Sequence, residues 1–189
     1  MKLILDVGGA KKTYEPATHV MDIVAKPDDM TKEYIRFDIC SGKWPFPDNY
    51  FDFVYCSNVL EDIKDPAFVC REMSRIAKSG TILVPNPITE LAHGIDTWPG
   101  ADKYSGFCHH RWIVISKGDS LTFLPKWSIT SAYNWIPNIS KKELWEKFIL
   151  QFNWTNKILF EEIEMITWKE YYKTLQKLTG TNPDPERFK

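Results

Sequence analysis

The stretch Leu3-Ile4-Leu5-Asp6-Val7-Gly8-Gly9 lies close to the start of the chain and decides the fold that we expect. Its continuous apolar run predicts a short strand that is buried on both faces, which is the usual pattern in a parallel sheet. The two glycines predict a tight turn directly after the strand, because a residue without a Cβ adopts backbone conformations that other residues avoid.

Similar apolar runs follow along the first half of the chain and are expected to form further strands of the same sheet. They cover residues 20–24, 34–40, 51–56 and 81–84. A helix is expected before the last run, with Asp65 as its N-cap, Pro66 in its first turn and Gly80 past its end. Its apolar stripe consists of Phe68, Val69, Met73 and Ile76. This order of elements predicts an α/β fold with a mostly parallel sheet flanked by helices.

Polar residues stand at or near the carboxyl ends of these strands. They are Asp6, Asp22, Asp38 and the pair Ser57-Asn58. In open parallel sheets, ligands bind beyond the carboxyl ends of the strands, at the place where the strand order reverses. The sequence therefore predicts that these side chains converge on one edge of the sheet.

The second half of the chain has a different character. Residues 88–110 show no sustained period and are expected to form a long ordered loop. Strands are expected at residues 112–116 and 121–124, and a last helix within residues 160–178. The segment Ser140–Glu143 has the form of a capping box, and it predicts a helix that continues through Leu144, Phe148, Ile149 and Phe152.

Length and charge exclude several classes of protein. The 189 residues fit a single domain, and a formal net charge of -1 argues against a protein that mainly coats nucleic acid or an anionic membrane. The first apolar run is too short for a signal peptide or a membrane span, so a cytoplasmic location is the expectation. The four cysteines show no metal-binding or disulfide spacing and are expected to be reduced thiols.

Four segments, taken in order, resemble the class I S-adenosylmethionine-dependent methyltransferases, in particular the type 11-like branch. They are residues 3–9, residues 44–54 (Trp-Pro-Phe-Pro-Asp-Asn-Tyr-Phe-Asp-Phe-Val), residues 57–62 (Ser-Asn-Val-Leu-Glu-Asp) and residues 72–80. The resemblance spans about the first 87 residues. It implies a Rossmann-like sheet in which residues 1–87 form the cofactor-binding core, while residues 88–189 of the same domain cover the sheet and close the pocket.

The resemblance also implies S-adenosyl-L-methionine as the cofactor and assigns residues to it. Asp22, with Ile23 beside it, matches the acid that holds the ribose hydroxyls, and Asp38 with Ile39 matches the position that contacts the adenine. Asp6 matches the acid that orients the first loop or holds the methionine end. The remaining cofactor positions are Gly8, Gly9, Ser57 and Asn58.

The chain departs from the family between the first two strands. The family has a helix there, but only residues 10–17 are present, and they include Pro16, so a full helix is not expected. Eight residues reach some 26 Å at roughly 3.3 Å each, which is enough to return the chain without a helix. We therefore expect a compact variant of the fold, abbreviated between the first and second strands.

Transfer of a methyl group from a sulfonium needs in-line positioning of the acceptor, and a base when the acceptor is a hydroxyl. The candidate bases are His93, His109 and His110, and Tyr104, Arg111 and Trp112 are candidates for contact with a small hydroxyl or amine acceptor such as a sugar. The histidines lack a recognised metal spacing, so no metal site is predicted. A degenerate fold that serves as a binding or scaffolding module remains the alternative, and a homodimer through the aromatic-rich second half is a further expectation.

Overall fold

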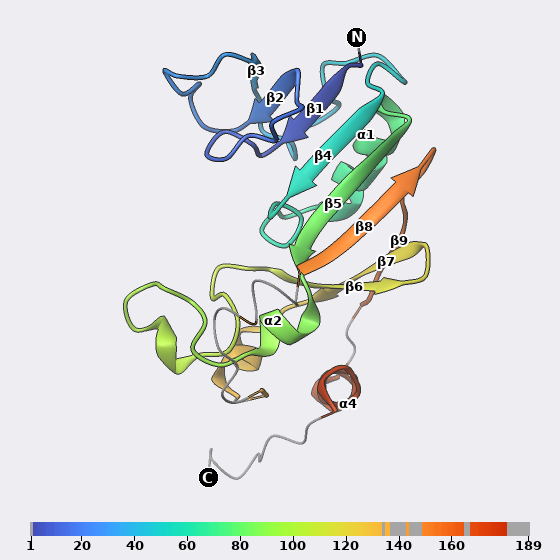
Figure 1. The fold of residues 1–189 in the computed structure, drawn as a ribbon. Coiled ribbons are helices and arrows are strands. Elements are labelled where there is room, and N and C mark those ends of the chain that lie inside the picture. The colour runs from blue at the N-terminus through green and yellow to red at the C-terminus, as the bar shows by residue number, and fades with distance from the viewer. Residues whose placement is uncertain (1, 134, 137–142, 144–148, 165–166, 181–189) are drawn as a thin grey trace.

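The computed structural model describes residues 2–133, 135–136, 143, 149–164 and 167–180. Its centre is a six-stranded sheet with the order β3-β2-β1-β4-β5-β8 (Figure 1). The strands are β1 (Ile4–Val7), β2 (His19–Asp22), β3 (Glu33–Arg36), β4 (Phe53–Ser57), β5 (Ser79–Pro85) and β8 (Ile149–Thr155). The first five run parallel to one another, and β8 runs antiparallel to β5.

This arrangement confirms the predicted fold class, a Rossmann-like and mostly parallel sheet. The chain adds β2 and β3 on one side of β1 and then crosses to β4 on the other side. The strand order therefore reverses between β1 and β4, and the crevice at their carboxyl ends is where such sheets bind ligands.

The crossover from β1 to β2 contains no helix, as the short segment predicts. Backbone hydrogen bonds hold it against the sheet: the Gly8 N–H donates to the Met21 carbonyl at 2.8 Å, and the Thr18 N–H donates to the Ile4 carbonyl at 2.9 Å. Above the sheet, the ring of Tyr14 stacks on that of Tyr55 with centroids 4.2 Å apart. An aromatic contact thus covers part of the surface that a crossover helix would cover.

Helix α1 (Pro66–Ile76) joins β4 to β5 and begins as the sequence predicts, since the Asp65 carboxylate accepts the Phe68 N–H at 2.7 Å. Its residues Val69, Met73 and Ile76 are fully buried in the core. Gly80 lies past the helix end, as predicted, but it does not cap the helix, because the C-cap is Ala77 and Gly80 belongs to β5. A Cβ at Gly80 would lie 2.4 Å from the Val54 carbonyl oxygen, so the position needs glycine for close packing.

The two faces of the sheet differ in burial. Val54, Cys56, Ile82 and Val84 are buried on the face that packs with α1. The alternate residues on the other face are half-buried or exposed; they include Tyr55, Thr81, Leu83, Gln151 and Asn153. In Figure 1, α1 lies behind β4 and β5, in agreement with this difference.

The described residues of the second half form a smaller three-stranded sheet and two helices, most of which lie beyond the carboxyl ends of β4 and β5 (Figure 1). The sheet consists of β6 (Trp112–Lys117), β7 (Ser120–Pro125) and β9 (Leu159–Glu162), in the order β6-β7-β9. The helices are α2 (Pro87–Leu91) and α4 (Trp168–Thr179), and short 3-10 turns occur at Ala101–Lys103 and Ser128–Ala132. Gly180 ends α4 in the left-handed conformation, as the sequence predicts.

Two predictions for this half are wrong. Residues 88–110 are not all loop, because α2 occupies their beginning, with the Asn86 side chain accepting the Thr89 N–H at 3.0 Å. Ile149 and Phe152 lie on strand β8 rather than on a helix. Residues 140–142 of the expected capping box, together with Leu144 and Phe148, lie outside the described residues.

Many aromatic residues of the second half form a second core of their own. Trp135 and Tyr171 are fully buried in a cluster that also packs against Trp127 and Trp168. The Trp127 and Tyr171 rings stack with centroids 4.7 Å apart. Many of the aromatic side chains therefore pack in the interior of the protein. None of the described helices is both long and apolar enough to span a membrane.

Candidate functional site

A cavity of about 340 Å³ lies at the carboxyl edge of the sheet, on the β1 side of the strand reversal. Loops from four strands line it, which follows from parallel strands ending at the same edge. Six of the nine residues proposed for cofactor binding line this cavity, and they are Gly8, Asp22, Ile23, Asp38, Ile39 and Asn58. The structure therefore brings together residues that are as many as 50 positions apart in the sequence.

Backbone conformation opens the floor of the cavity. Gly8 has a φ of +79°, and a Cβ at this position would lie only 2.4 Å from a methyl carbon of Val59. Asn58 also adopts a left-handed backbone conformation, with a φ of 53°, directly after β4. Glycine and asparagine are the residues that accept such conformations most readily. The turns after β1 and β4 can thus approach each other closely around the cavity.

Asp22 ends β2 and anchors the loop over the cavity. Its carboxylate accepts the Ala10 N–H at 3.0 Å and the Val24 N–H at 3.2 Å. A carboxylate offers about four lone-pair sites, so these two bonds leave sites for further donors. Asp22 can therefore hold the short crossover and accept hydroxyl protons from a ribose in the cavity.

Asp38 and Ile39 form the wall next to β3. Asp38 closes a turn by accepting the Cys40 N–H at 2.9 Å, and the Trp44 indole N–H donates to the Ile39 carbonyl at 2.9 Å. Trp44 is itself buried, and its main-chain N–H donates to the Glu72 carboxylate at 2.6 Å. This chain of contacts ties the cavity wall to helix α1.

The other three proposed cofactor residues do not line the cavity. The Asp6 side chain turns into the crossover, where it accepts the Tyr14 N–H at 2.6 Å, and Asp6 is only 1% exposed. Burial raises the pKa of Asp6 to about 6, against the opposing effect of the Tyr14 hydrogen bond, and the charge of Asp22 raises it further. Gly9 lies against Asp6, and the Ser57 hydroxyl accepts a hydrogen bond from the Asn58 amide at 3.1 Å. The Asp6 carboxylate thus holds the loop through Tyr14, and its role toward the cofactor stays a prediction.

Several residues that sequence reasoning missed also line the cavity. They are Lys11, Met21, Phe37, Val59, Asp62 and Ile63. Met21 and Phe37 are neighbours of Asp22 and Asp38, so the strand-end pattern could have found them. Lys11 and Asp62 lie in irregular segments whose course depends on tertiary contacts, and no local pattern marks them.

A second cavity has a volume of about 610 Å³, and two of its lining residues face Asp62. His109 and His110 line it, as do the three proposed acceptor-binding residues, Tyr104, Arg111 and Trp112. His93 does not line this cavity, and its Nε2 lies 3.1 Å from the Lys103 carbonyl. The structure thus brings His109 and His110 together with the acceptor candidates and leaves His93 apart.

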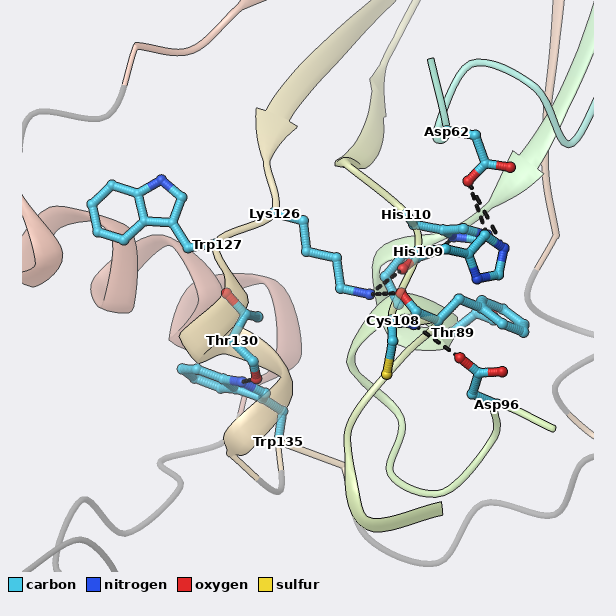
Figure 2. Close-up of polar contacts among 12 residues, drawn as sticks. Asp62, Thr89, Asp96, Cys108, His109, His110, Lys126, Trp127, Thr130 and Trp135 are labelled. Carbon is cyan, nitrogen blue, oxygen red and sulfur yellow. Dashed lines mark hydrogen bonds and ion pairs between the residues drawn. The ribbon is translucent and has the colours of Figure 1, made fainter. Parts of the chain in front are cut away.

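Backbone contacts fix the histidine pair next to the loop that follows β4. The Arg111 N–H and the Trp112 N–H both donate to the Glu61 carbonyl, at 2.7 and 3.1 Å. Upstream, the buried Asp96 carboxylate accepts the Cys108 N–H at 2.9 Å. Because both histidines precede β6 rather than lie on it, the alternation of a strand does not separate them, and both side chains reach Asp62 (Figure 2).

A chain of ionisable side chains links Asp62 through His110 to the buried residues Glu90 and Lys126. Asp62 Oδ1 lies 3.6 Å from His110 Nε2, and His110 Nδ1 is hydrogen-bonded to Glu90 Oε1. The other Glu90 oxygen accepts from Lys126 Nζ at 2.8 Å, and both partners of this ion pair are almost fully buried. Partial burial raises the pKa of Asp62, although the neighbouring histidines act to lower it.

Comparison with known proteins gives a match to one family model. Residues 13–84 match the family model described as a methyltransferase domain. A search of the curated proteins gave no match. Several solved structures described as S-adenosylmethionine-dependent methyltransferases also match this chain, with low sequence identity and low TM-scores.

The S-adenosylmethionine-dependent methyltransferase from Mesorhizobium loti is 14% identical, with a TM-score of 0.39 over 80% of this chain and 67% of that one. The one from Aquifex aeolicus is 20% identical, with a TM-score of 0.33 over 46% and 57% of the two chains. The one from Clostridium acetobutylicum is 12% identical, with a TM-score of 0.36 over 92% and 70%. This chain covers less than half the length of the first three structures that it matches, at 46%, 45% and 49%.

The family match covers β2, β3, β4, α1 and most of β5, which form the wall of the first cavity and the core beneath it. The strand order and the parallel direction of β1 to β5 are those of a Rossmann-like sheet. Residues 13–84, which are less than half of the chain, thus resemble a methyltransferase domain and lie within a Rossmann-like sheet.

Proposed function

We propose that this protein transfers the methyl group of S-adenosylmethionine to a hydroxyl or amine of a small acceptor such as a sugar. The observation that carries the proposal is the position of Asp62. It lines the cavity at the strand reversal, and its carboxylate faces the two histidines that line the second cavity. One site for the cofactor and one for the acceptor therefore meet at this residue.

The first cavity has the chemistry that the cofactor needs. The carboxylate of Asp22 suits the ribose hydroxyls, and the apolar side chains of Phe37 and Ile39 suit the faces of an adenine ring. Gly8 leaves space where a Cβ would collide with Val59. S-adenosylmethionine supplies a methyl group on a positively charged sulfur, which keeps the electron pair of the broken bond when the methyl leaves.

The second cavity suits a polar acceptor with ring faces. Its lining combines the aromatic side chains of Tyr104, Trp112 and Trp127 with the cations of Lys64 and Arg111. Aromatic faces and charged donors together are typical of sites that bind sugars and their anionic derivatives. The acceptor attacks the methyl carbon in line with the sulfur, and its proton leaves to a base or to water.

Methyl transfer itself tests the proposal. The full chain is incubated with methyl-labelled S-adenosylmethionine and a panel of sugars, nucleotide sugars, amino sugars and small amines. We expect labelled product and S-adenosylhomocysteine with at least one of them. Tyr104→Ala is expected to raise the KM for the acceptor, whereas the matched Tyr50→Ala is not, because Tyr50 has a similar exposure, 41% against 44%, but lies away from the cavities.

The alternative is a binding or scaffolding module without catalysis, and one observation favours it. The crossover after β1 has no helix, and two of its N–H groups, those of Ala10 and Tyr14, donate to Asp22 and Asp6. They are therefore not available to bind the methionine carboxylate. Cofactor binding without transfer to any acceptor in the panel would support this alternative.

A further inference from the structure

Three potential metal ligands converge at the junction of the two cavities. One ligand atom from each of Asp62, His109 and His110 lies within 4.8 Å of the other two. Asp62 Oδ1 is 3.6 Å from His110 Nε2 and 3.9 Å from His109 Nε2. Figure 2 shows both imidazole rings directed at the same carboxylate oxygen.

These distances are too long for hydrogen bonds, which span about 2.7 to 3.2 Å between heavy atoms. They are close to the spacing of ligands around one ion. With zinc–nitrogen and zinc–oxygen bonds of about 2.0 to 2.2 Å, two ligands in a tetrahedral site lie roughly 3.4 Å apart. A contraction of about half an ångström would bring Asp62 Oδ1 to this spacing from both histidine nitrogens.

The surroundings of His110 are those of a metal-bound imidazole. Its Nδ1 is bonded to Glu90, which fixes the tautomer that leaves the Nε2 lone pair directed at Asp62. Metal-ligating histidines almost always donate their second ring N–H to a carboxylate or carbonyl in this way. Lys126 in turn holds Glu90 at 2.8 Å, so the outer partner of the ligand is itself fixed.

An unpaired carboxylate oxygen at the same place indicates a missing cation. Asp62 Oδ1 is buried and has no hydrogen-bond partner in the described part of the chain, although it is the atom that both histidines face. Buried carboxylate oxygens without a partner are costly, and a bound cation removes that cost.

We propose that Asp62, His109 and His110 bind one divalent transition-metal ion, with zinc as the expected ion. Two imidazoles and one carboxylate are the ligand set of catalytic zinc sites, which keep a further position open. The identity of the site rests on these three residues alone. Its role rests on the proposed function: the open position takes the acceptor oxygen, and the ion lowers the pKa of that hydroxyl.

In that role the acceptor hydroxyl gives its proton to water, and its oxygen lone pair forms the new bond to the methyl carbon. The carbon–sulfur bond breaks with its electron pair on sulfur, so that S-adenosylhomocysteine is released. His110 then acts as a ligand rather than as the base, because one Nε2 lone pair cannot serve both purposes.

The test is metal binding in the absence of cofactor and acceptor. The full chain is stripped with chelator and titrated with Zn²⁺ by calorimetry, with Co²⁺ as a spectroscopic probe of tetrahedral coordination and Mg²⁺ as a hard-ion comparison. We expect about one Zn²⁺ per chain, a tetrahedral Co²⁺ spectrum and no comparable binding of Mg²⁺.

His109→Ala is the decisive variant, because 51% of its side chain is exposed and its loss does not open the core. We expect a loss of Zn²⁺ affinity of at least about tenfold, and a similar loss in Asp62→Asn. His93→Ala is the matched control and should bind as the unmodified chain does. Zinc binding that is absent from the unmodified chain, or unchanged in His109→Ala, would overturn the proposal. Neither result depends on cofactor binding or transfer, so failure of the metal site is distinguishable from failure of the proposed function.

Discussion

A Cβ built on Gly9 would lie 2.0 Å from Oδ2 of Asp6, the same oxygen that accepts the Tyr14 N–H at 2.6 Å. The second glycine of the turn is therefore required by a buried carboxylate and not by its own backbone conformation. The crossover that replaces a helix in this fold is wound around Asp6. Its stability depends on the fit between these two residues.

Gly9→Ala should destabilise the protein, because the added methyl group displaces the Asp6 carboxylate from its bond with Tyr14. We expect the free energy of unfolding to fall by about 1 to 3 kcal/mol, the usual range for overpacking. Asp6→Ala in the same chain removes the collision. The two changes should therefore cost less together than the sum of their separate effects, and chemical denaturation of all four proteins measures this coupling. Strictly additive effects would show that the collision is relieved elsewhere.

Asp6 should also make stability depend on pH. Its pKa is raised from 3.8 to about 6 in the folded protein, so folding disfavours the ionised form. The contribution is therefore fully present below about pH 4 and is lost as the pH rises through about 6. We expect a loss of roughly 1 to 3 kcal/mol over this window, relative to Asp6→Asn, which cannot ionise. Denaturation curves of both proteins from pH 4 to pH 8 measure the difference, and parallel pH profiles would refute it.

Asp22→Ala should weaken binding of S-adenosylhomocysteine by about tenfold or more, because it removes a charged acceptor from the ribose side of the cavity. It also frees the Ala10 and Val24 N–H groups that Asp22 holds. Asp29→Ala is the matched control, since Asp29 is an exposed carboxylate in the next loop and does not line the cavity. Equal affinities of the two variants would remove Asp22 from the site.

Arg75→Lys should destabilise both the fold and the cavity wall. The Arg75 guanidinium donates twice to Glu72, at 2.7 and 2.9 Å, and also to Asp48 and to the carbonyls of Trp44 and Phe46. A lysine lacks this planar set of donors.

We expect a loss of about 1 to 3 kcal/mol in the free energy of unfolding and weaker cofactor binding. The cause of the weaker binding is that Trp44, which Glu72 and Arg75 hold, supports Ile39. Arg71→Lys on the same helix is the control, because Arg71 only lies over the Phe160 ring at 5.8 Å. A loss as large in the control would show that any arginine of this helix is equally important.

The strands of the central sheet could be predicted where the signal is local. The apolar run before Gly8 is followed by a turn signal, and the helix after Asp65 is preceded by a capping residue. The structure confirms a strand and a helix at these two places. Strand β8 could not be predicted in this way. Ile149 and Phe152 have the spacing of a helix face, whereas the strand partner of Phe152 is Ile82 on β5, seventy positions earlier in the sequence. The long-range pairing with β5 therefore makes this segment a strand, although its local apolar spacing favours a helix.

The candidate site divides in the same way. Asp22 and Asp38 follow directly from strands, so their convergence on one edge is a consequence of the parallel sheet. The approach of His109 and His110 to Asp62 depends instead on two hydrogen bonds to the Glu61 carbonyl. The spacing of residues in the sequence does not indicate these hydrogen bonds, so the sequence alone does not predict a metal site there.

The central claim is that the cavity at the strand reversal binds S-adenosylmethionine and its product. Calorimetric titration of S-adenosylhomocysteine into the full chain tests it most directly, because it needs no acceptor. We predict one binding event per chain with a dissociation constant of about 100 µM or tighter, which corresponds to a binding free energy of roughly 5.5 kcal/mol. No heat of binding at ligand concentrations of about 1 mM, where even a free energy near 4 kcal/mol would be visible, would contradict it.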